Sequence, residues 1–191
     1  MQIAALGRAI LDGLAVAGVV GCIKHMPGHG RSTADTHKEM PTVTASAAEL
    51  EADLKPFRKL HDAPLGMTGH LLFTAWDPEL PATLSPTVIR DIIRGEIGFD
   101  GLLLTDDIDM EALTGSVPER SWRAIAAGCD VVLNCWAKMD DMTGIAERCG
   151  TLSEAALARV HAAMADAAEG PALEDLLAKR DALLALAGER A

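Results

Sequence analysis

The sequence predicts an α/β fold built on a parallel sheet, and three observations support this prediction. Four short apolar segments alternate with stretches of helical periodicity along the 191 residues. No hairpin signal lies between consecutive apolar segments. Each apolar segment is followed by polar or titratable side chains. Alternation of this kind implies right-handed crossover connections, which place successive strands parallel to one another.

We predict two helices and one strand in residues 3–61. An amphipathic helix is expected at residues 3–17, and a buried strand at residues 19–23. A loop rich in Gly, Pro and Thr follows. Ser46 is expected to cap a helix over residues 46–61, and Pro56 is expected to kink or split that helix.

The remaining elements continue the alternation. Pro86 suits the first position of a helix that Gly98 ends. The expected strands lie at 65–68, 101–104 and 130–133, the expected helices at 85–98 and 119–127, and three helical stretches follow from 139 onward, including 153–167 and 172–187.

Polar groups stand at the carboxyl end of every predicted strand. They are Lys24-His25, His70, Asp106-Asp107 and Asn134. Such a cluster matches the catalytic rim of a (β/α)8 barrel, and it also matches an open doubly wound sheet. A complete barrel needs eight units and about 250 residues. This sequence offers four units and begins with a helix that would ordinarily follow an earlier strand.

Composition narrows the class of protein. The net charge of -11 argues against a nucleic-acid or anionic-membrane partner, because no basic stripe is present to neutralise phosphates. No apolar run reaches the roughly 20 residues that span a bilayer, and the amino terminus does not resemble a signal peptide. The four cysteines form no CxxC pair, so we expect buried, reduced thiols in a cytoplasmic protein.

The densest group of titratable residues is Lys24-His25-Met26-Pro27-Gly28-His29-Gly30, followed by Asp35-Thr36-His37. Asp35 could bind one ring nitrogen of His37 and raise the basicity of the other, as a general acid/base requires. Alone, this spacing equally describes a solvated carboxylate beside an unrelated histidine. Lys24 and His25 could bind substrate hydroxyls, or the lysine could pair with a buried carboxylate.

Asp106 and Asp107 are adjacent carboxylates at a strand end. Side chains alternate along a strand, so one carboxylate should enter the pocket and the other should cap the next segment or pair with a base. A pocket carboxylate beside a cation such as Lys24 suits a nucleophile or a metal ligand. A lone Asp-Asp pair is more often a helix cap. His70 is open to similar alternatives.

Taken together, these motifs resemble glycoside hydrolase family 3, and specifically its bacterial β-N-acetylglucosaminidases of cell-wall recycling. The matching segments are 24–30, Asp35 to His37 with Lys38-Glu39 and Pro41, and 98–111. The joint occurrence of these motifs in this order is a strong signal. The resemblance is clear to Asn134 and general beyond it.

The resemblance implies a retaining double displacement through a covalent glycosyl-enzyme. It makes Asp106 the nucleophile and His37 the acid/base, with Asp35 orienting the imidazole. This differs from the usual two-carboxylate plan of glycosidases. The resemblance implies neither a metal nor an organic cofactor.

The resemblance also implies a substrate and a fold. Lys24 and His25 would bind the terminal N-acetylglucosamine of a muropeptide or disaccharide, with His70 as a further pocket residue. The implied fold is a TIM (β/α)8 barrel, here about its carboxyl-terminal half with additional carboxyl-terminal helices. We expect residues 1–191 to form one partial catalytic domain.

Two rival interpretations remain open from the sequence. One is a metal-dependent hydrolase whose ligands are His25, His29, His37, Asp106 and Asp107, although no HxH or HExxH spacing is present. The other is a catalytically silent half-barrel. Such a chain would need a complementing half or self-association to close its open edges.

Overall fold

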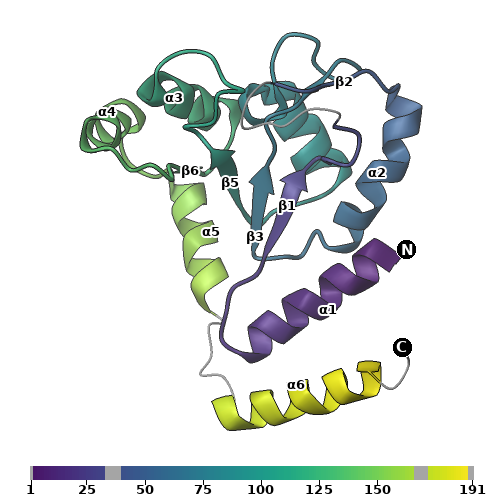
Figure 1. Cartoon of the computed structure of the whole chain (residues 1–191). Coiled ribbons are helices and arrows are strands. Elements are labelled where there is room, and N and C mark those ends of the chain that lie inside the picture. Colours follow the sequence, from purple (N-terminus) through teal and green to yellow (C-terminus); the bar gives the residue numbers. More distant parts are fainter. Residues whose placement is uncertain (1, 33–39, 166–171, 189–191) are drawn as a thin grey trace.

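The computed structural model describes residues 2–32, 40–165 and 172–188. Its centre is a four-stranded parallel sheet in the order β1-β3-β5-β6 (Figure 1). The strands are β1 (Cys22–Met26), β3 (Leu65–Thr68), β5 (Leu102–Asp107) and β6 (Val131–Leu133). All three pairings within this sheet are parallel, which confirms the predicted arrangement.

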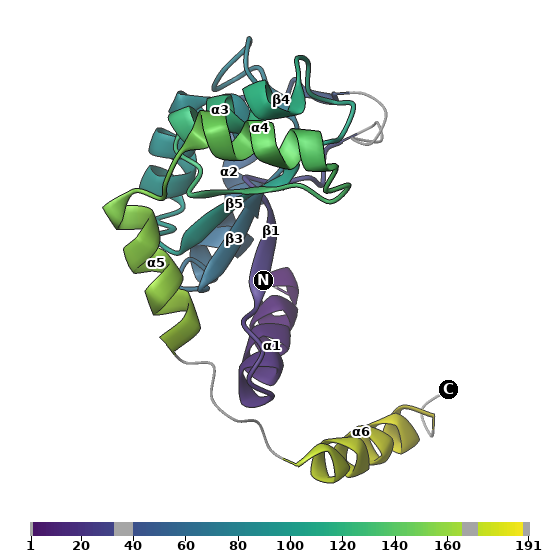
Figure 2. The same ribbon diagram turned by 90° about the vertical axis from the view of Figure 1, so that its left-hand side faces the viewer.

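The helices follow the predicted alternation. They are α1 (Gln2–Val16), α2 (Ala47–Lys59), the short 3-10 turn η1 (Ala82–Leu84), the π-type helix η2 (Val88–Glu96), α3 (Val117–Ala127), α4 (Met139–Cys149), α5 (Glu154–Ala165) and α6 (Leu173–Gly188). Helix α5 lies on the β6 side of the sheet and α1 lies near β1, while α6 lies apart from the sheet (Figures 1 and 2). None of the helices in the described ranges is long and apolar enough to cross a membrane.

The starts of α2 and α3 show why these residues form helices. Ser46 and Glu49 make a reciprocal capping box at α2, in which the Glu49 carboxylate accepts from the Ser46 backbone N–H at 2.8 Å. Ser116 accepts from the Glu119 backbone N–H at α3. Pro56 lies inside α2, but the helix continues to Lys59, so the predicted split is wrong.

The position of β1 corrects the prediction. The strand was expected at residues 19–23, but its pairing with β3 begins at Cys22 opposite Leu65. The side chain of Val19 is 49% exposed, so the apolar run begins before the sheet does. Within β1, Ile23 and Met26 are buried and Lys24 is exposed. Lys24 and His25 therefore belong to the strand rather than to the loop after it.

Two further differences concern short or extended strands. β2 (Thr42–Val43) and β4 (Leu72–Phe73) form a separate parallel pair that was not predicted. Two residues are too few to show an alternating pattern. β5 extends to Asp107, beyond the expected range of 101–104, because its last residues still pair with β6.

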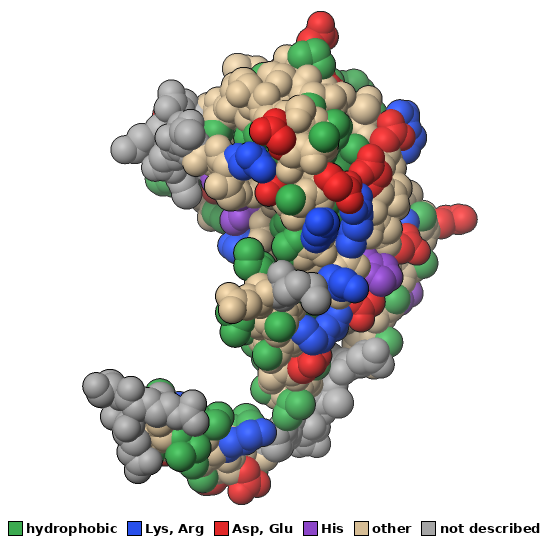
Figure 3. Space-filling view, turned by 90° about the vertical axis from the view of Figure 1, so that its right-hand side faces the viewer, with side chains coloured by type: hydrophobic (Ala, Val, Ile, Leu, Met, Phe, Trp, Pro, Cys, Tyr) green, Lys and Arg blue, Asp and Glu red, His purple; other side chains and the backbone are tan. Residues whose placement is uncertain are grey.

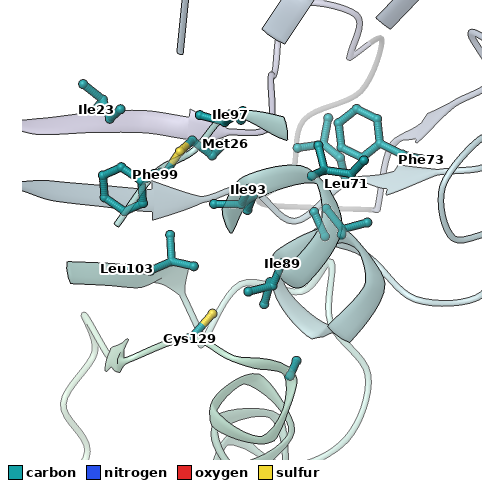
Figure 4. Packing of buried hydrophobic residues seen from close by; sticks show 14 of the residues in the cluster. Ile23, Met26, Leu71, Phe73, Ile89, Ile93, Ile97, Phe99, Leu103 and Cys129 are labelled. Carbon is teal, nitrogen blue, oxygen red and sulfur yellow. The ribbon is translucent and has the colours of Figure 1, made fainter. Parts of the chain in front are cut away.

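The sheet and η2 bury a common apolar core, shown in Figure 4. Phe99 is fully buried beside Met26, and both side chains fill the space left by Gly66. A Cβ atom at Gly66 would lie 2.3 Å from Met26 Cε and 2.7 Å from Phe99 Cζ. Each such buried side chain contributes about 1.5–3 kcal/mol to folding. This packing fixes the sheet that carries the polar strand ends.

A buried carboxylate joins three elements around β5. Asp130 Oδ2 accepts hydrogen bonds from Arg94 Nη2 and from the Leu103 backbone N–H, each at 2.8 Å. Asp130 Oδ1 accepts from Arg159 Nη1 at 3.0 Å. The carboxylate thereby connects η2, β5 and α5 at the end of the sheet opposite the polar cluster.

The surface around α2 carries both signs of charge. Figure 3 shows acidic and basic side chains mixed on this face. Arg58 pairs with Glu51 within α2 and with Glu96 of η2 at 3.1 Å, and Arg31 pairs with Asp53. Exposed pairs of this kind add little stability, at most about 1 kcal/mol each. This face shows no single-sign basic patch.

Candidate active site

The carboxyl ends of the parallel strands meet at one edge of the sheet (Figure 1). His25 comes from β1, His70 follows β3, Asp106 comes from β5 and Asn134 follows β6. In parallel α/β folds this edge is where reactive groups gather. The structure thus places four of the predicted polar groups on one rim.

The two adjacent aspartates point to different partners, as the alternation along a strand predicts. The Asp106 side chain is 15% exposed, and its Oδ2 lies 3.5 Å from His25 Nε2. Asp107 Oδ1 instead accepts from the backbone N–H groups of Asp109, at 3.2 Å, and Cys135, at 3.0 Å. Asp106 therefore faces the His25 ring, whereas Asp107 holds the loops after β5 and β6.

His25 is the titratable group beside the Asp106 carboxylate. Burial lowers the pKa of His25, the nearby Asp106 carboxylate partly offsets this effect, and Lys24, His29 and His70 lower the pKa further. At neutral pH the ring is therefore uncharged. A neutral imidazole can donate one hydrogen bond and accept another, which suits contact with a sugar hydroxyl.

Lys24 does not act as the cation that was expected beside Asp106. Its side chain is exposed on β1, and no ion pair joins it to Asp106.

The peptide bonds Lys24–His25 and Met26–Pro27 are both cis. The His25 and His29 rings lie 5.5 Å apart between centroids. Lys24, His25 and His29 all line a groove between α1 and α2 at the free edge of β1.

His70 does not have the geometry of the predicted sugar contact. Its side chain is fully buried, and both ring nitrogens have protein partners. Nδ1 lies 2.8 Å from Thr83 Oγ1, and Nε2 lies 2.9 Å from the backbone carbonyl oxygen of Asp107. The ring has no free polar atom to offer a ligand, which corrects the expectation of direct binding.

Two residues that support the rim were not found from the sequence. Thr83 lies in η1, and no spacing pattern distinguishes it from other threonines. Arg120 of α3 donates from Nη1 to the carbonyl oxygens of Ile108 and Met110, each at 3.1 Å. It thereby holds the loop that follows the two aspartates.

The cysteines correct one expectation. Cys129 is buried, and burial raises the pKa of its thiol to about 12. Cys135, in contrast, is exposed on the loop after β6. Cys22 and Cys149 are half-buried. The prediction that all four thiols are buried is therefore wrong for Cys135.

The predicted acid/base pair lies outside the described residues. Asp35 and His37 both fall within 33–39, so the structure does not test their placement. Among the residues that the structure does describe, no three or more His, Cys, Asp or Glu side chains form a group that could hold a metal ion. The described part of the proposed metal set, which includes His25, Asp106 and Asp107, therefore forms no ligand cluster.

These observations define a parallel α/β domain with a carboxylate and an imidazole at the carboxyl ends of its strands. The family model described as "Glycosyl hydrolase family 3 N terminal domain" matches residues 1–166. The chain belongs to glycoside hydrolase family 3. Its four parallel strands and their helices confirm the expectation of a partial (β/α)8 barrel.

Proteins similar in sequence are named β-hexosaminidase. The one from Chromobacterium violaceum is 43% identical over 138 residues, which is 70% of this chain and 38% of that protein. The one from Tolumonas auensis is 41% identical over 142 residues, covering 70% of this chain and 42% of that protein. The chain thus spans about two fifths of the length of these curated relatives.

Solved structures of the same family are similar in fold. A family 3 β-N-acetylglucosaminidase from Paenibacillus sp. str. FPU-7 matches with a TM-score of 0.80 and 34% identity, over 89% of this chain and 36% of that chain. NagZ from Neisseria gonorrhoeae, solved in complex with N-trifluoroacetyl-D-glucosamine, matches with a TM-score of 0.75 and 31% identity. That match covers 92% of this chain and 50% of the other.

Proposed function

We propose that this chain carries the nucleophile of a retaining β-N-acetylhexosaminidase, and that the nucleophile is Asp106. The observation that supports this most is the different surroundings of the two aspartates. Asp106 is partly exposed and faces His25, whereas Asp107 is occupied by two backbone N–H groups. A nucleophile must face the sugar that it attacks; Asp106 Oδ2 faces His25, a proposed sugar contact, whereas the Asp107 carboxylate is held against the loops after β5 and β6.

The proposed reaction has two steps. In the first, an Asp106 oxygen bonds to the anomeric carbon while the bond to the leaving oxygen breaks, and His37 donates a proton to that oxygen. In the second, His37 takes a proton from water as the water oxygen attacks the same carbon and releases Asp106. Asp35 orients His37 throughout, as the family resemblance implies. These steps use no cofactor.

The proposed substrate is a terminal, β-linked N-acetylglucosamine on a peptidoglycan fragment. The names of the relatives support the sugar, and the complex of the Neisseria gonorrhoeae protein contains a close analogue of it. Lys24 and His25 are proposed to bind its hydroxyl groups from β1. Action in the cytoplasm, on fragments released from the cell wall, is part of the same proposal.

The proposal is tested by hydrolysis of 4-nitrophenyl N-acetyl-β-glucosaminide. The full chain is assayed alone and mixed with the amino-terminal part of the Chromobacterium violaceum relative, because this chain spans only 38% of that protein. Asp106→Asn should abolish turnover in whichever sample is active. Asp140→Asn, the same change at an exposed position of α4, should leave turnover unchanged.

The same assay separates the rival functions. Turnover that EDTA does not reduce excludes the metal-dependent hydrolase. Folded protein with no turnover in either sample contradicts the proposed activity and favours a catalytically silent domain. Turnover that survives Asp106→Asn contradicts the assignment of the nucleophile.

A further inference from the structure

We propose that His70 is a positioning residue, which fixes the backbone of Asp107 and thereby the direction of the Asp106 carboxylate. Thr68 and Thr83 complete the hydrogen-bonded chain through which it acts. This inference rests on the proposed function, because it concerns the placement of the proposed nucleophile. It assigns His70 a role other than contact with the sugar.

The direction of each hydrogen bond follows from the acceptor at the end of the chain. The Asp107 carbonyl oxygen can only accept, so His70 Nε2 carries the proton and donates it at 2.9 Å. In a neutral ring Nδ1 then accepts, and the Thr83 hydroxyl donates to it at 2.8 Å. The Thr83 oxygen accepts in turn from the Thr68 hydroxyl at 2.8 Å. The carbonyl oxygen of Gly69, at 3.2 Å, is the more distant acceptor for the Thr83 proton.

Burial makes this chain of hydrogen bonds specific. Thr68, His70 and Thr83 are all fully buried, so water does not compete for their polar atoms. Burial also lowers the pKa of His70, which keeps the ring neutral as the donor pattern requires. The chain therefore joins the ends of β3 and β5 through η1 in one arrangement.

Asp107 connects the hydrogen-bonded chain of His70 to the carboxylate of Asp106. Its carbonyl oxygen is held by His70, and its backbone N–H donates to Asp106 Oδ1 at 2.9 Å. Its side chain is held by the N–H groups of Asp109 and Cys135. Because these contacts fix the backbone of Asp107, the N–H group that donates to Asp106 Oδ1 is also fixed. The other oxygen, Asp106 Oδ2, is then directed at His25.

The titration of His25 reports where the Asp106 carboxylate lies, because that carboxylate raises the pKa of His25. Thr83→Val removes the hydroxyl at nearly constant volume, and Thr83→Ser keeps the hydroxyl as the matched control. We expect the His25 pKa, measured by NMR on the full chain, to fall in Thr83→Val, because the Asp106 carboxylate that raises it moves away. In Thr83→Ser it should stay at the wild-type value. Long-range nitrogen–proton spectra should show the Nε2–H tautomer of His70.

A folded Thr83→Val variant with unchanged His25 titration overturns the proposal, and so does an Nδ1–H tautomer of His70. If Thr83→Val does not fold, Thr68→Val replaces it, with a smaller fall of the His25 pKa expected and no fall overturning the proposal. These readouts need no turnover, so they stand even if the proposed activity fails. Where turnover is present, Thr83→Val should lower kcat about tenfold or more and leave KM unchanged.

Discussion

Asp130→Ala should strongly destabilise the domain, because this carboxylate serves three donors at once. The Asp130 side chain is only 6% exposed. Its loss leaves the Leu103 N–H without a partner, removes the carboxylate that pairs with Arg94, and removes one of the two carboxylates that pair with Arg159. Removing one partner of a buried ion pair costs about 3–5 kcal/mol. Both arginines keep other acceptors, including the Phe99 carbonyl oxygen for Arg94, so we expect about 3–4 kcal/mol.

Urea unfolding followed by far-UV circular dichroism measures this loss. For a domain of this size the expected cost corresponds to a melting temperature lower by about 6–16 °C. Asp130→Asn keeps an oxygen for the Leu103 N–H and should cost less. Asp91→Asn, at an exposed position of η2, serves as the control and should stay within about 0.5 kcal/mol of wild type. A loss below about 1 kcal/mol in Asp130→Ala would refute the reasoning.

Three further predictions concern a cap, the thiols and pH. Ser46→Ala should lower the free energy of unfolding by about 1 kcal/mol in the same urea assay. Iodoacetamide should modify exposed Cys135 in the native protein, whereas Cys129, with its pKa raised to about 12, should react only after unfolding. Burial lowers the pKa of His25 and His70 below 6.5, so the unfolded chain binds more protons below that pH. The free energy of unfolding should therefore rise between about pH 5 and pH 7, and a flat profile would contradict this.

The sheet and the start of α2 could be predicted because they depend on local signals. The alternation of apolar segments and helical stretches was enough to predict that the strands of the sheet run parallel to one another. Ser46 caps α2 through its own side chain, as predicted, whereas the Ser116 cap was not predicted and α3 begins at Val117 rather than at residue 119. The assignment of all residues 1–191 to one domain stays a prediction, since the family model matches residues 1–166.

The errors came from features set by tertiary contacts. The start of β1 depends on where Cys22 meets Leu65, and the apolar residues before it gave no sign of this. β2 and β4 exist only because two distant two-residue segments pair. Sequence alone could not decide these registers, because pairing energy comes from the partner strand.

The candidate site was predicted in part. Alternation along a strand predicted that Asp106 and Asp107 point to different partners, and the family resemblance made Asp106 the nucleophile. The surroundings of His70 could not be predicted, because its partner Thr83 comes from a separate turn thirteen positions further along the chain. Its burial converts an expected ligand contact into a structural hydrogen bond. The roles of Asp35 and His37 stay predictions.

The central claim is that Asp106 forms the covalent glycosyl intermediate, and mass spectrometry can test it directly. The sample that hydrolyses the substrate is treated with a fluorinated N-acetylglucosaminyl fluoride. This reagent transfers its sugar to the nucleophile and loses fluoride, and water hydrolyses the resulting glycosyl-enzyme only slowly. After peptic digestion, the added sugar mass should lie on the peptide that contains Asp106, and Asp106→Asn should carry no label. A sugar found on any other residue of a sample that hydrolyses the substrate would contradict the account.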